Sequence, residues 1–318
     1  MSSERVLLIA GGGTLGTYAA KELLLKGCRV DIICLEDKIS DNENLRFFKE
    51  RADLPYMEKF LEGNKYDGIV NFIHYPDPEI YPPVHELLIK SAGHLIVVSS
   101  YRVYADEQHP ITEDSPMLLD VVKDKEFLET EKYALSKAKL EKYLRSSCQG
   151  QNWTIVRPVI SFSKRRFDLV TYSGQDIINL TNNGETVLLP IEAKNVTAGL
   201  DWAGNTGKLI ANLLFKKNTF GEAYTVSSAQ NLTWGEIAQV YTDLLGTRFE
   251  WLEMPEFRKA TASFHRELCD DGLVYDRLFD RRIDNSKILR ATGLTKEDFL
   301  PMRKGLEIEL SRLKKEGR

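Results

Sequence analysis

The sequence predicts an α/β protein with a doubly wound parallel sheet and a smaller, mainly C-terminal substrate-binding region. Short apolar strands alternate with helices in the first half of the chain, glycines separate the first strand from the first helix, and the pattern loosens beyond residue 160. Strands that are apolar throughout are typical of parallel sheets covered by helices on both faces. The length of 318 residues allows one large domain with a smaller region attached.

The N-terminal segments follow the order strand, glycine turn, helix, strand. Residues 5–10 (RVLLIA) form an apolar run of strand length, and a helix is expected over 17–26. Gly27 directly follows that helix, where the left-handed conformation favours glycine. Residues 29–35 (RVDIICL) predict a second buried strand. These segments form a βαβ unit.

The same alternation continues along the chain. Further strands are expected at residues 68–73, 94–99 and 154–157, and helices at 81–92, 129–146, 204–214, 234–245, 285–291 and 302–315. We assign residues 1–160 to a nucleotide-binding domain, completed by about 195–228, and assign 161–194 and 229–318 to the substrate-binding region.

Composition narrows the class of protein. The formal net charge is −4 and the pI is about 5.9, which disfavours a nucleic-acid binder that neutralises many phosphates. The sequence contains no apolar run of about 18 residues and no signal-peptide pattern at its start, so we expect neither membrane insertion nor secretion. The four cysteines are scattered, as in a cytoplasmic protein with reduced thiols. The histidines lack ligand spacing, so no metal is expected.

The glycine turn predicts a bound dinucleotide in a Rossmann-type domain. A glycine turn lets backbone amides approach a pyrophosphate at the positive end of a helix. In the strict fingerprint glycines recur every three residues, and those positions are here Ala10, Gly13 and Gly16. The expected phosphate-side contacts are Gly11, Gly13, Thr14, Leu15 and Gly16.

The end of the second strand bears on the choice of cofactor. Glu36 follows this strand, where NAD-binding proteins carry an acidic residue for the ribose. No basic residue comes before Lys38, so NAD is favoured and NADP is not excluded. Asp53, with Leu54 beside it, either reaches the adenine or caps a helix. His74 either contacts the cofactor or packs in the core.

Two side chains on one helix face carry the expected chemistry. Tyr133 and Lys137 are four residues apart, so both project from the same side of the predicted helix. A nearby ammonium stabilises the phenolate, and the tyrosine can then act as a general base or acid. With 13 tyrosines in the chain such a pair can arise by chance. Ser99 and Ser100, at the end of an earlier strand, supply the hydroxyl that would bind the reacting oxygen.

The chain resembles an extended short-chain dehydrogenase/reductase of the NAD-dependent epimerase/dehydratase family. Besides the glycine turn and the Tyr133/Lys137 pair, the matching segments are residues 97–104 (VVSSYRVY), 110–116 (PITEDSP), 156–158 (VRP), 221–226 (GEAYTV), 233–238 (TWGEIA) and 284–287 (DNSK). The resemblance implies that Ser100, Tyr133 and Lys137 are catalytic and that Pro158 borders the nicotinamide. It also implies a homodimer paired through the tyrosine-bearing helix.

The resemblance also bears on the reaction. Dehydrating relatives carry an Asp-Glu pair after the catalytic hydroxyl and decarboxylating relatives a glutamate, whereas this chain has Tyr101-Arg102. We therefore expect reversible oxidation of an alcohol of a sugar or nucleotide-sugar-like small molecule. Epimerisation through a ketone is favoured over net dehydrogenase or reductase turnover.

Other interpretations of these residues stay open. Substrate contacts are expected from Ser100, Tyr101, Arg102, Arg165 and Arg281, although runs of charged residues are usually solvated faces. The competing class is a non-catalytic relative that binds RNA or senses redox state. The joint presence of Ser100, Tyr133 and Lys137 argues against it, since a scaffold needs no proton relay.

Overall fold

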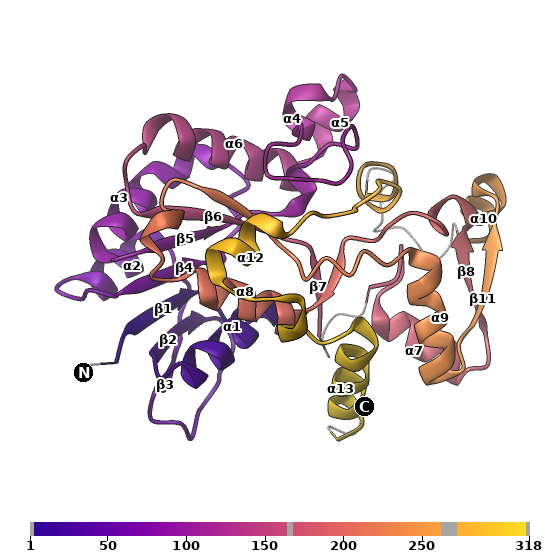
Figure 1. Cartoon of the computed structure of the whole chain (residues 1–318), viewed down its shortest axis with the longest axis horizontal. Coiled ribbons are helices and arrows are strands. Elements are labelled where there is room, and N and C mark those ends of the chain that lie inside the picture. The colour runs from indigo at the N-terminus through magenta and orange to yellow at the C-terminus, as the bar shows by residue number, and fades with distance from the viewer. Residues whose placement is uncertain (1–2, 164–167, 262–271, 316–318) are drawn as a thin grey trace.

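A computed structural model describes residues 3–163, 168–261 and 272–315 and contains a seven-stranded parallel sheet (Figure 1). The strand order is β10-β6-β5-β4-β1-β2-β3. These strands are β1 (Arg5–Ile9), β2 (Arg29–Cys34), β3 (Leu45–Lys49), β4 (Gly68–Asn71), β5 (Leu95–Val98), β6 (Trp153–Pro158) and β10 (Ala223–Val226). The predicted α/β class with a doubly wound parallel sheet is confirmed.

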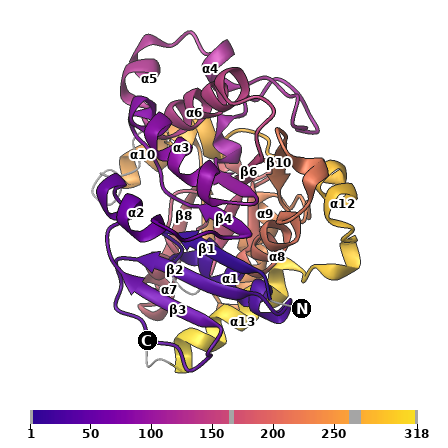
Figure 2. The ribbon, with the colours of Figure 1, turned by 90° about the vertical axis from the view of Figure 1, so that its left-hand side faces the viewer.

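Helices cover both faces of this sheet (Figures 1 and 2). Alternate residues of β1 divide between them: Val6 and Leu8 join one buried cluster, while Leu7 and Ile9 join another. The first cluster includes side chains from α1 (Thr14–Leu25), α8 (Ala203–Leu213) and α12 (Ser286–Thr292). The second includes side chains from α2 (Leu54–Leu61), α3 (Tyr81–Ser91) and α6 (Tyr133–Ser147).

The boundaries differ from prediction at two helices near the candidate site. The helix expected over 129–146 is two helices, α5 (Lys125–Thr130) and α6, because the Glu131 side chain accepts the backbone N–H groups of Tyr133 and Ala134. Helix α1 begins at Thr14, earlier than predicted, with Gly13 as its N-cap. Gly27 has the expected left-handed backbone, with φ of 82°.

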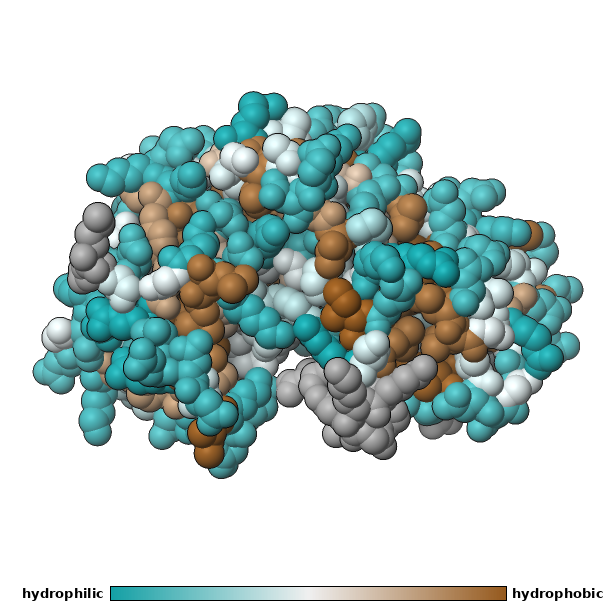
Figure 3. All heavy atoms as spheres, turned by 60° about the horizontal axis from the view of Figure 1, so that its bottom comes forward, coloured by the Kyte–Doolittle hydropathy of each residue, from teal (hydrophilic) through white to brown (hydrophobic). Residues whose placement is uncertain are grey.

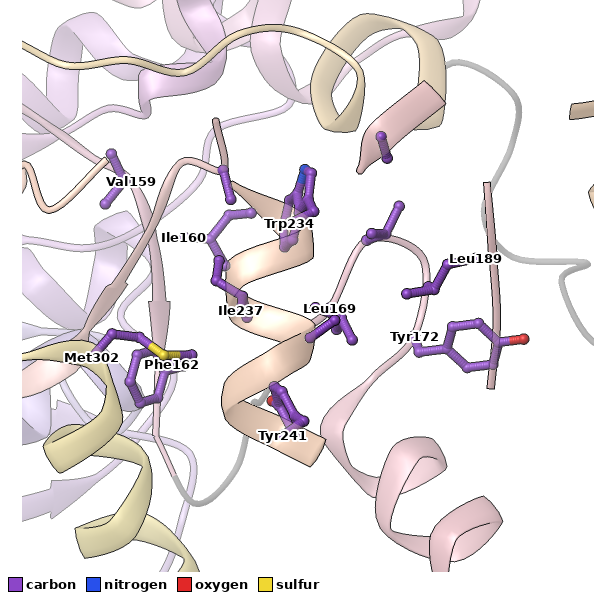
Figure 4. Close-up of a cluster of buried hydrophobic side chains, with 14 of the residues drawn as sticks. Val159, Ile160, Phe162, Leu169, Tyr172, Leu189, Trp234, Ile237, Tyr241 and Met302 are labelled. Carbon is purple, nitrogen blue, oxygen red and sulfur yellow. The ribbon is translucent and has the colours of Figure 1, made fainter. Parts of the chain in front are cut away.

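A second group of elements lies to the right in Figure 1. It contains α7 (Gly174–Asn182), β8 (Thr186–Pro190), α9 (Trp234–Leu245), β11 (Arg248–Leu252) and α10 (Met254–Thr261), with β8 and β11 paired in parallel. In Figure 4, Trp234, Ile237 and Tyr241 project from α9 into an apolar cluster. Ile160 and Phe162 of β7 (Ile160–Phe162) belong to this cluster, so it joins the second group to the chain that leaves the central sheet.

The remaining elements connect these two groups. Strand β9 (Leu200–Trp202) pairs in parallel with β7, and α4 (Leu118–Val121) packs near α6. Helix α13 (Met302–Lys315) returns to α1, and its Glu309 accepts a hydrogen bond from the Tyr18 hydroxyl of that helix. Its carboxylate also accepts Trp202 Nε1 at 2.9 Å. The C-terminal helix is therefore attached to the helix that follows the glycine turn.

Polar residues cover most of the face in Figure 3, and apolar residues gather in separate places between them. Across the described parts of the chain, we find no helix that combines the length and the apolar character needed to cross a membrane. Nor do the described residues bring together three or more histidine, cysteine, aspartate or glutamate side chains in a way that could hold a metal ion.

A buried ion pair attaches α6 to the sheet. Arg157 Nη2 of β6 lies 2.6 Å from Glu141 Oε2 of α6, and each side chain is only 1% exposed. Arg157 Nη1 also donates to the Tyr104 hydroxyl at 2.7 Å. A buried ion whose partner is removed has no water to replace that partner.

We expect Glu141→Ala to lower the free energy of unfolding by about 3–5 kcal/mol, because it leaves Arg157 buried and unpaired. Lys142→Ala, at the exposed neighbouring position of the same helix, is the matched control and should change it by less than about 0.5 kcal/mol. Urea unfolding followed by circular dichroism measures both. Equal, small losses in the two variants would contradict the assigned role of the pair.

Candidate functional site

The direction of strand order reverses between β1 and β4, and ligands of open α/β sheets bind at such a reversal, beyond the carboxyl ends of the strands. A cavity of about 590 Å³ lies there. Its wall contains residues at or just beyond the carboxyl ends of four strands, namely Ala10, His74, Ser99, Ser100 and Pro158, together with Tyr133 and Lys137 from α6. The fold thus brings the three predicted catalytic residues to one cavity.

The glycine turn forms another part of this wall. Ala10, in the place of the first fingerprint glycine, has a left-handed φ of 55°. Gly16 packs on the turn itself, since a Cβ there would lie 2.3 Å from the Gly11 carbonyl oxygen. A Cβ on Gly13 would meet nothing within 4 Å, so the backbone at the start of α1 is open to the cavity.

The first turn of α1 is suited to an anion. It carries no acidic residue, and among the described residues no side chain caps it. Its free N–H groups and the positive end of the helix dipole therefore face the cavity at Gly13 and Thr14. This is the environment that a pyrophosphate requires.

We expect Gly16→Ala to lower the free energy of unfolding by more than about 2 kcal/mol, since its methyl group would collide with backbone that cannot move aside. Gly13→Ala is the matched control, with an unchanged stability expected because its methyl group enters open space. Thermal unfolding of the two variants tests this contrast. A Gly16→Ala protein as stable as Gly13→Ala would show that the turn is packed differently.

A second cavity, of about 980 Å³, continues from the first and shares Ala10, Gly13 and His74 with it. The predicted residues Glu36, Asp53 and Leu54 line it, together with apolar side chains such as Leu35, Ile80 and Val84. Asp53 caps α2, its carboxylate accepting the Tyr56 N–H at 3.0 Å, and it also lines this cavity, so its contact with an adenine stays a prediction. Two cavities joined end to end fit an elongated ligand such as a dinucleotide.

Lys137 is held deep in the first cavity. Its Nζ donates to the carbonyl oxygens of Val98 at 2.6 Å and Ile73 at 3.3 Å, and it lies 6.0 Å from the centre of the Tyr133 ring. Burial lowers the pKa of Lys137 to about 8, although the charge of Glu141 opposes this shift. The ammonium is therefore close enough to Tyr133 to stabilise a phenolate.

His74 lies between the two cavities and not in a closed core. Its Nε2 is 2.8 Å from Ser136 Oγ, and its ring meets that of Tyr133 edge to face with centroids 4.8 Å apart. Burial and then the charge of Lys137 lower the pKa of His74, so the ring is neutral near pH 7. A neutral imidazole here can help to hold the tyrosine ring without adding charge.

Besides the predicted Tyr101 and Arg102, Asp276 and Arg277 line the first cavity, both from the helical turn η5 (Leu273–Arg277). Asp276 accepts the Tyr101 hydroxyl at 2.6 Å and Arg277 Nη1 at 2.6 Å. Burial raises the pKa of Asp276, but Arg277, Arg102 and Arg281 together outweigh it and the pKa is lowered, so the carboxylate stays ionised.

Of the predicted site residues that the structure describes, Gly11 and Arg281 line neither cavity. Gly11 packs beneath the turn against Leu8. Arg281 is 1% exposed and lies behind Tyr101, where it donates to the Tyr104 carbonyl oxygen at 3.0 Å. Arg165 lies outside the described residues. No sequence pattern singled out Asp276, because only the folded chain brings η5 to the cavity.

Comparison with known proteins agrees with this architecture. No family model matches the sequence, and no curated protein does. Among solved structures, WbmH of Bordetella bronchiseptica, a complex with NAD+, is 16% identical, with a TM-score of 0.70 over 99% of each chain. The epimerase Mth375 of Methanothermobacter thermautotrophicus is 14% identical, with a TM-score of 0.70 over 99% of this chain and 95% of that one. MoeE5 in complex with UDP-glucuronic acid and NAD is 15% identical, with a TM-score of 0.69 over 98% and 99%.

These likenesses extend over nearly the whole length of the chain, including the second group of elements. The protein therefore has the fold of the extended short-chain dehydrogenases/reductases, the class that includes NAD-dependent epimerases and dehydratases. That is also the fold which the resemblance in the sequence predicted.

Proposed function

We propose that the protein is an NAD-dependent oxidoreductase, specifically an epimerase, that acts on a hydroxyl of a sugar or nucleotide-sugar-like small molecule through a ketone. The observation that carries this proposal is the meeting of an open helix N-terminus with Ser100, Tyr133 and Lys137 around one cavity. An anion site next to a proton relay is what a dinucleotide-dependent alcohol oxidation requires.

Each residue has a role in this reaction. The Ser100 hydroxyl hydrogen-bonds the substrate oxygen, and Tyr133, as the phenolate, takes the proton of the substrate hydroxyl. Lys137 stabilises the phenolate with its positive charge. When bound, NAD supplies the acceptor for the hydride that leaves the carbinol carbon. For epimerisation the ketone would then have to turn in the cavity, so that the same hydride returns to its opposite face while Tyr133 returns the proton.

The cofactor would occupy both cavities. Gly13, Thr14, Leu15 and Gly16 would receive the pyrophosphate, and Pro158 and His74 would lie near the nicotinamide. Glu36 and Asp53 support NAD, because their carboxylates suit ribose hydroxyls and repel a 2′-phosphate. Lys38 donates to the Gly12 carbonyl oxygen at 2.6 Å and is occupied by that contact.

Calorimetric titration with NAD, NADH, NADP and NADPH tests the cofactor, after purified protein has been checked for retained nucleotide. We expect NAD and NADH to bind at least tenfold more tightly than their 2′-phosphorylated forms. Gly13→Ala should weaken this binding while the protein stays folded. Absence of binding by all four nucleotides would overturn the proposal.

Turnover distinguishes epimerisation from net oxidation. UDP-glucose and UDP-glucuronic acid, the sugars bound in the MoeE5 structures, are the first probes. An epimerase should change the sugar configuration without net formation of NADH, as measured by proton NMR and by absorbance at ~340 nm. Stoichiometric NADH would favour the alternative, a net dehydrogenase or reductase of another alcohol.

We further expect a homodimer paired through α6. The exposed side chains of this helix include Lys139, Lys142 and Arg145, so a two-fold pairing would bring like charges together. Salt should screen this repulsion and strengthen the dimer. Light scattering at low and high ionic strength tests this expectation, and a monomeric mass under both conditions would contradict it.

A further inference from the structure

Glu131, a residue that the sequence did not single out, lies directly before the helix that carries Tyr133. Its Oε1 accepts the backbone N–H groups of Tyr133 at 2.6 Å and Ala134 at 2.7 Å. Its other oxygen accepts Arg102 Nη2 at 3.2 Å, and the Glu131 side chain is only 9% exposed. One carboxylate thus caps the first turn of α6 and binds a guanidinium at the same time.

Arg102 extends this connection to η5 in the substrate-binding region. Its Nε lies 3.6 Å from Asp276 Oδ2, and Asp276 is itself fixed by Tyr101 and Arg277. The Arg102 guanidinium also lies 5.5 Å from the centre of the Tyr133 ring. A continuous series of charged contacts therefore runs from η5 through Arg102 and Glu131 to the backbone of Tyr133.

The position of Tyr133 makes such support necessary. Tyr133 is the first residue of α6, and the ends of helices fray unless their free N–H groups are capped. The Lys132 residue at the N-cap supplies no side-chain hydrogen bond, so the cap comes from Glu131. A reacting group displaced by about 1 Å can lose about 100-fold in rate.

We infer that Arg102 and Glu131 are positioning residues. They fix Tyr133 by linking the first turn of α6 to η5 of the substrate-binding region, so the placement of Tyr133 depends on η5. As far as turnover is concerned, this inference rests on the proposed function. It differs from the expectation that Arg102 is a substrate contact, because two carboxylates of the chain, those of Glu131 and Asp276, already face its guanidinium. It also explains why a positive residue follows Tyr101 in this chain.

The test uses Arg102→Met, Arg102→Lys, Glu131→Ala and the double variant with Arg102→Met and Glu131→Ala. Ser147→Ala, an exposed change at the other end of α6, is the control. Hydrogen exchange of the Tyr133 and Ala134 amides is measured by NMR on the full chain without ligand. We expect exchange at these amides to become at least tenfold faster in Arg102→Met and Glu131→Ala, and Arg102→Lys to restore part of the protection.

Turnover is measured with the UDP-sugar that the wild-type enzyme accepts. We expect kcat to fall about 10- to 100-fold in the single variants, with KM and the Kd of NAD changed less than threefold. The double variant should be no slower than the worse single variant, because both changes break the same connection.

Other outcomes overturn the inference. A rise in KM with kcat unchanged in Arg102→Met would make Arg102 a substrate contact, and unchanged amide exchange would show that the connection does not hold Tyr133. If the wild-type protein turns over neither UDP-sugar, the proposed function fails for these substrates. The hydrogen-exchange measurement on the Tyr133 and Ala134 amides needs no substrate, and it then decides the inference by itself.

Discussion

Tyr133→Phe is expected to lower kcat by about 10³- to 10⁴-fold, because it removes the hydroxyl that transfers the proton and leaves the ring in place. The ring contacts with His74 and with the Arg102 guanidinium do not involve that hydroxyl and should persist. The Kd of NAD should therefore change less than about threefold, and Tm by no more than a few degrees. Steady-state kinetics with calorimetry on the same preparation provides all three values.

Ser100→Ala is the companion to this measurement. Ser100 Oγ accepts the Arg102 backbone N–H at 3.2 Å, so its removal should cost some stability as well as rate. A Tyr133→Phe enzyme that keeps more than a fifth of wild-type kcat would exclude Tyr133 as the general acid/base. In that case Ser99, whose buried hydroxyl lines the same cavity and has no hydrogen-bond partner among the described residues, would be the next candidate to examine.

The central sheet was predictable because its strands are buried on both faces. Segments such as β1 and β2 are mostly apolar and almost wholly buried, as is typical of parallel strands packed between helices. Strand β3 escaped prediction because it lies at the edge of the sheet with alternating exposure, and Arg46 within it pairs with Asp31 of β2 at 2.7 Å. Only the sheet shows that this charged residue belongs to a strand.

The candidate site was predictable for those residues whose positions follow from helix spacing or from the end of a strand. Tyr133 and Lys137 share a helix face, and Ser100 follows a buried strand, so topology alone brings them to one edge. Asp276 and Glu131 follow no such rule. Glu131 lies in a segment that reads as continuous helix, and its capping role appears only once Arg102 and the first turn of α6 are packed against it.

Lys137→Met is expected to change the pH dependence of stability as well as to remove activity. Burial lowers the pKa of Lys137 from its model-peptide value of 10.5 to about 8, so the folded protein binds fewer protons than the unfolded chain between these two pH values. Stability rises with pH wherever the unfolded state binds more protons. Wild-type protein should therefore gain about 2–3 kcal/mol relative to Lys137→Met between pH 7 and pH 10.

This comparison isolates the effect of Lys137 on stability from its effect on turnover. Every other titrating group is common to both proteins, so their difference in unfolding free energy reports on position 137 alone. Lys142→Met, an exposed lysine on the same helix, should show no such pH-dependent difference from wild type. In urea unfolding at several pH values, a difference between wild type and Lys137→Met that stays constant from pH 7 to 10 would mean that Lys137 is not desolvated. The loss of kcat, about 100-fold or more, follows because the phenolate of Tyr133 loses its nearest ammonium.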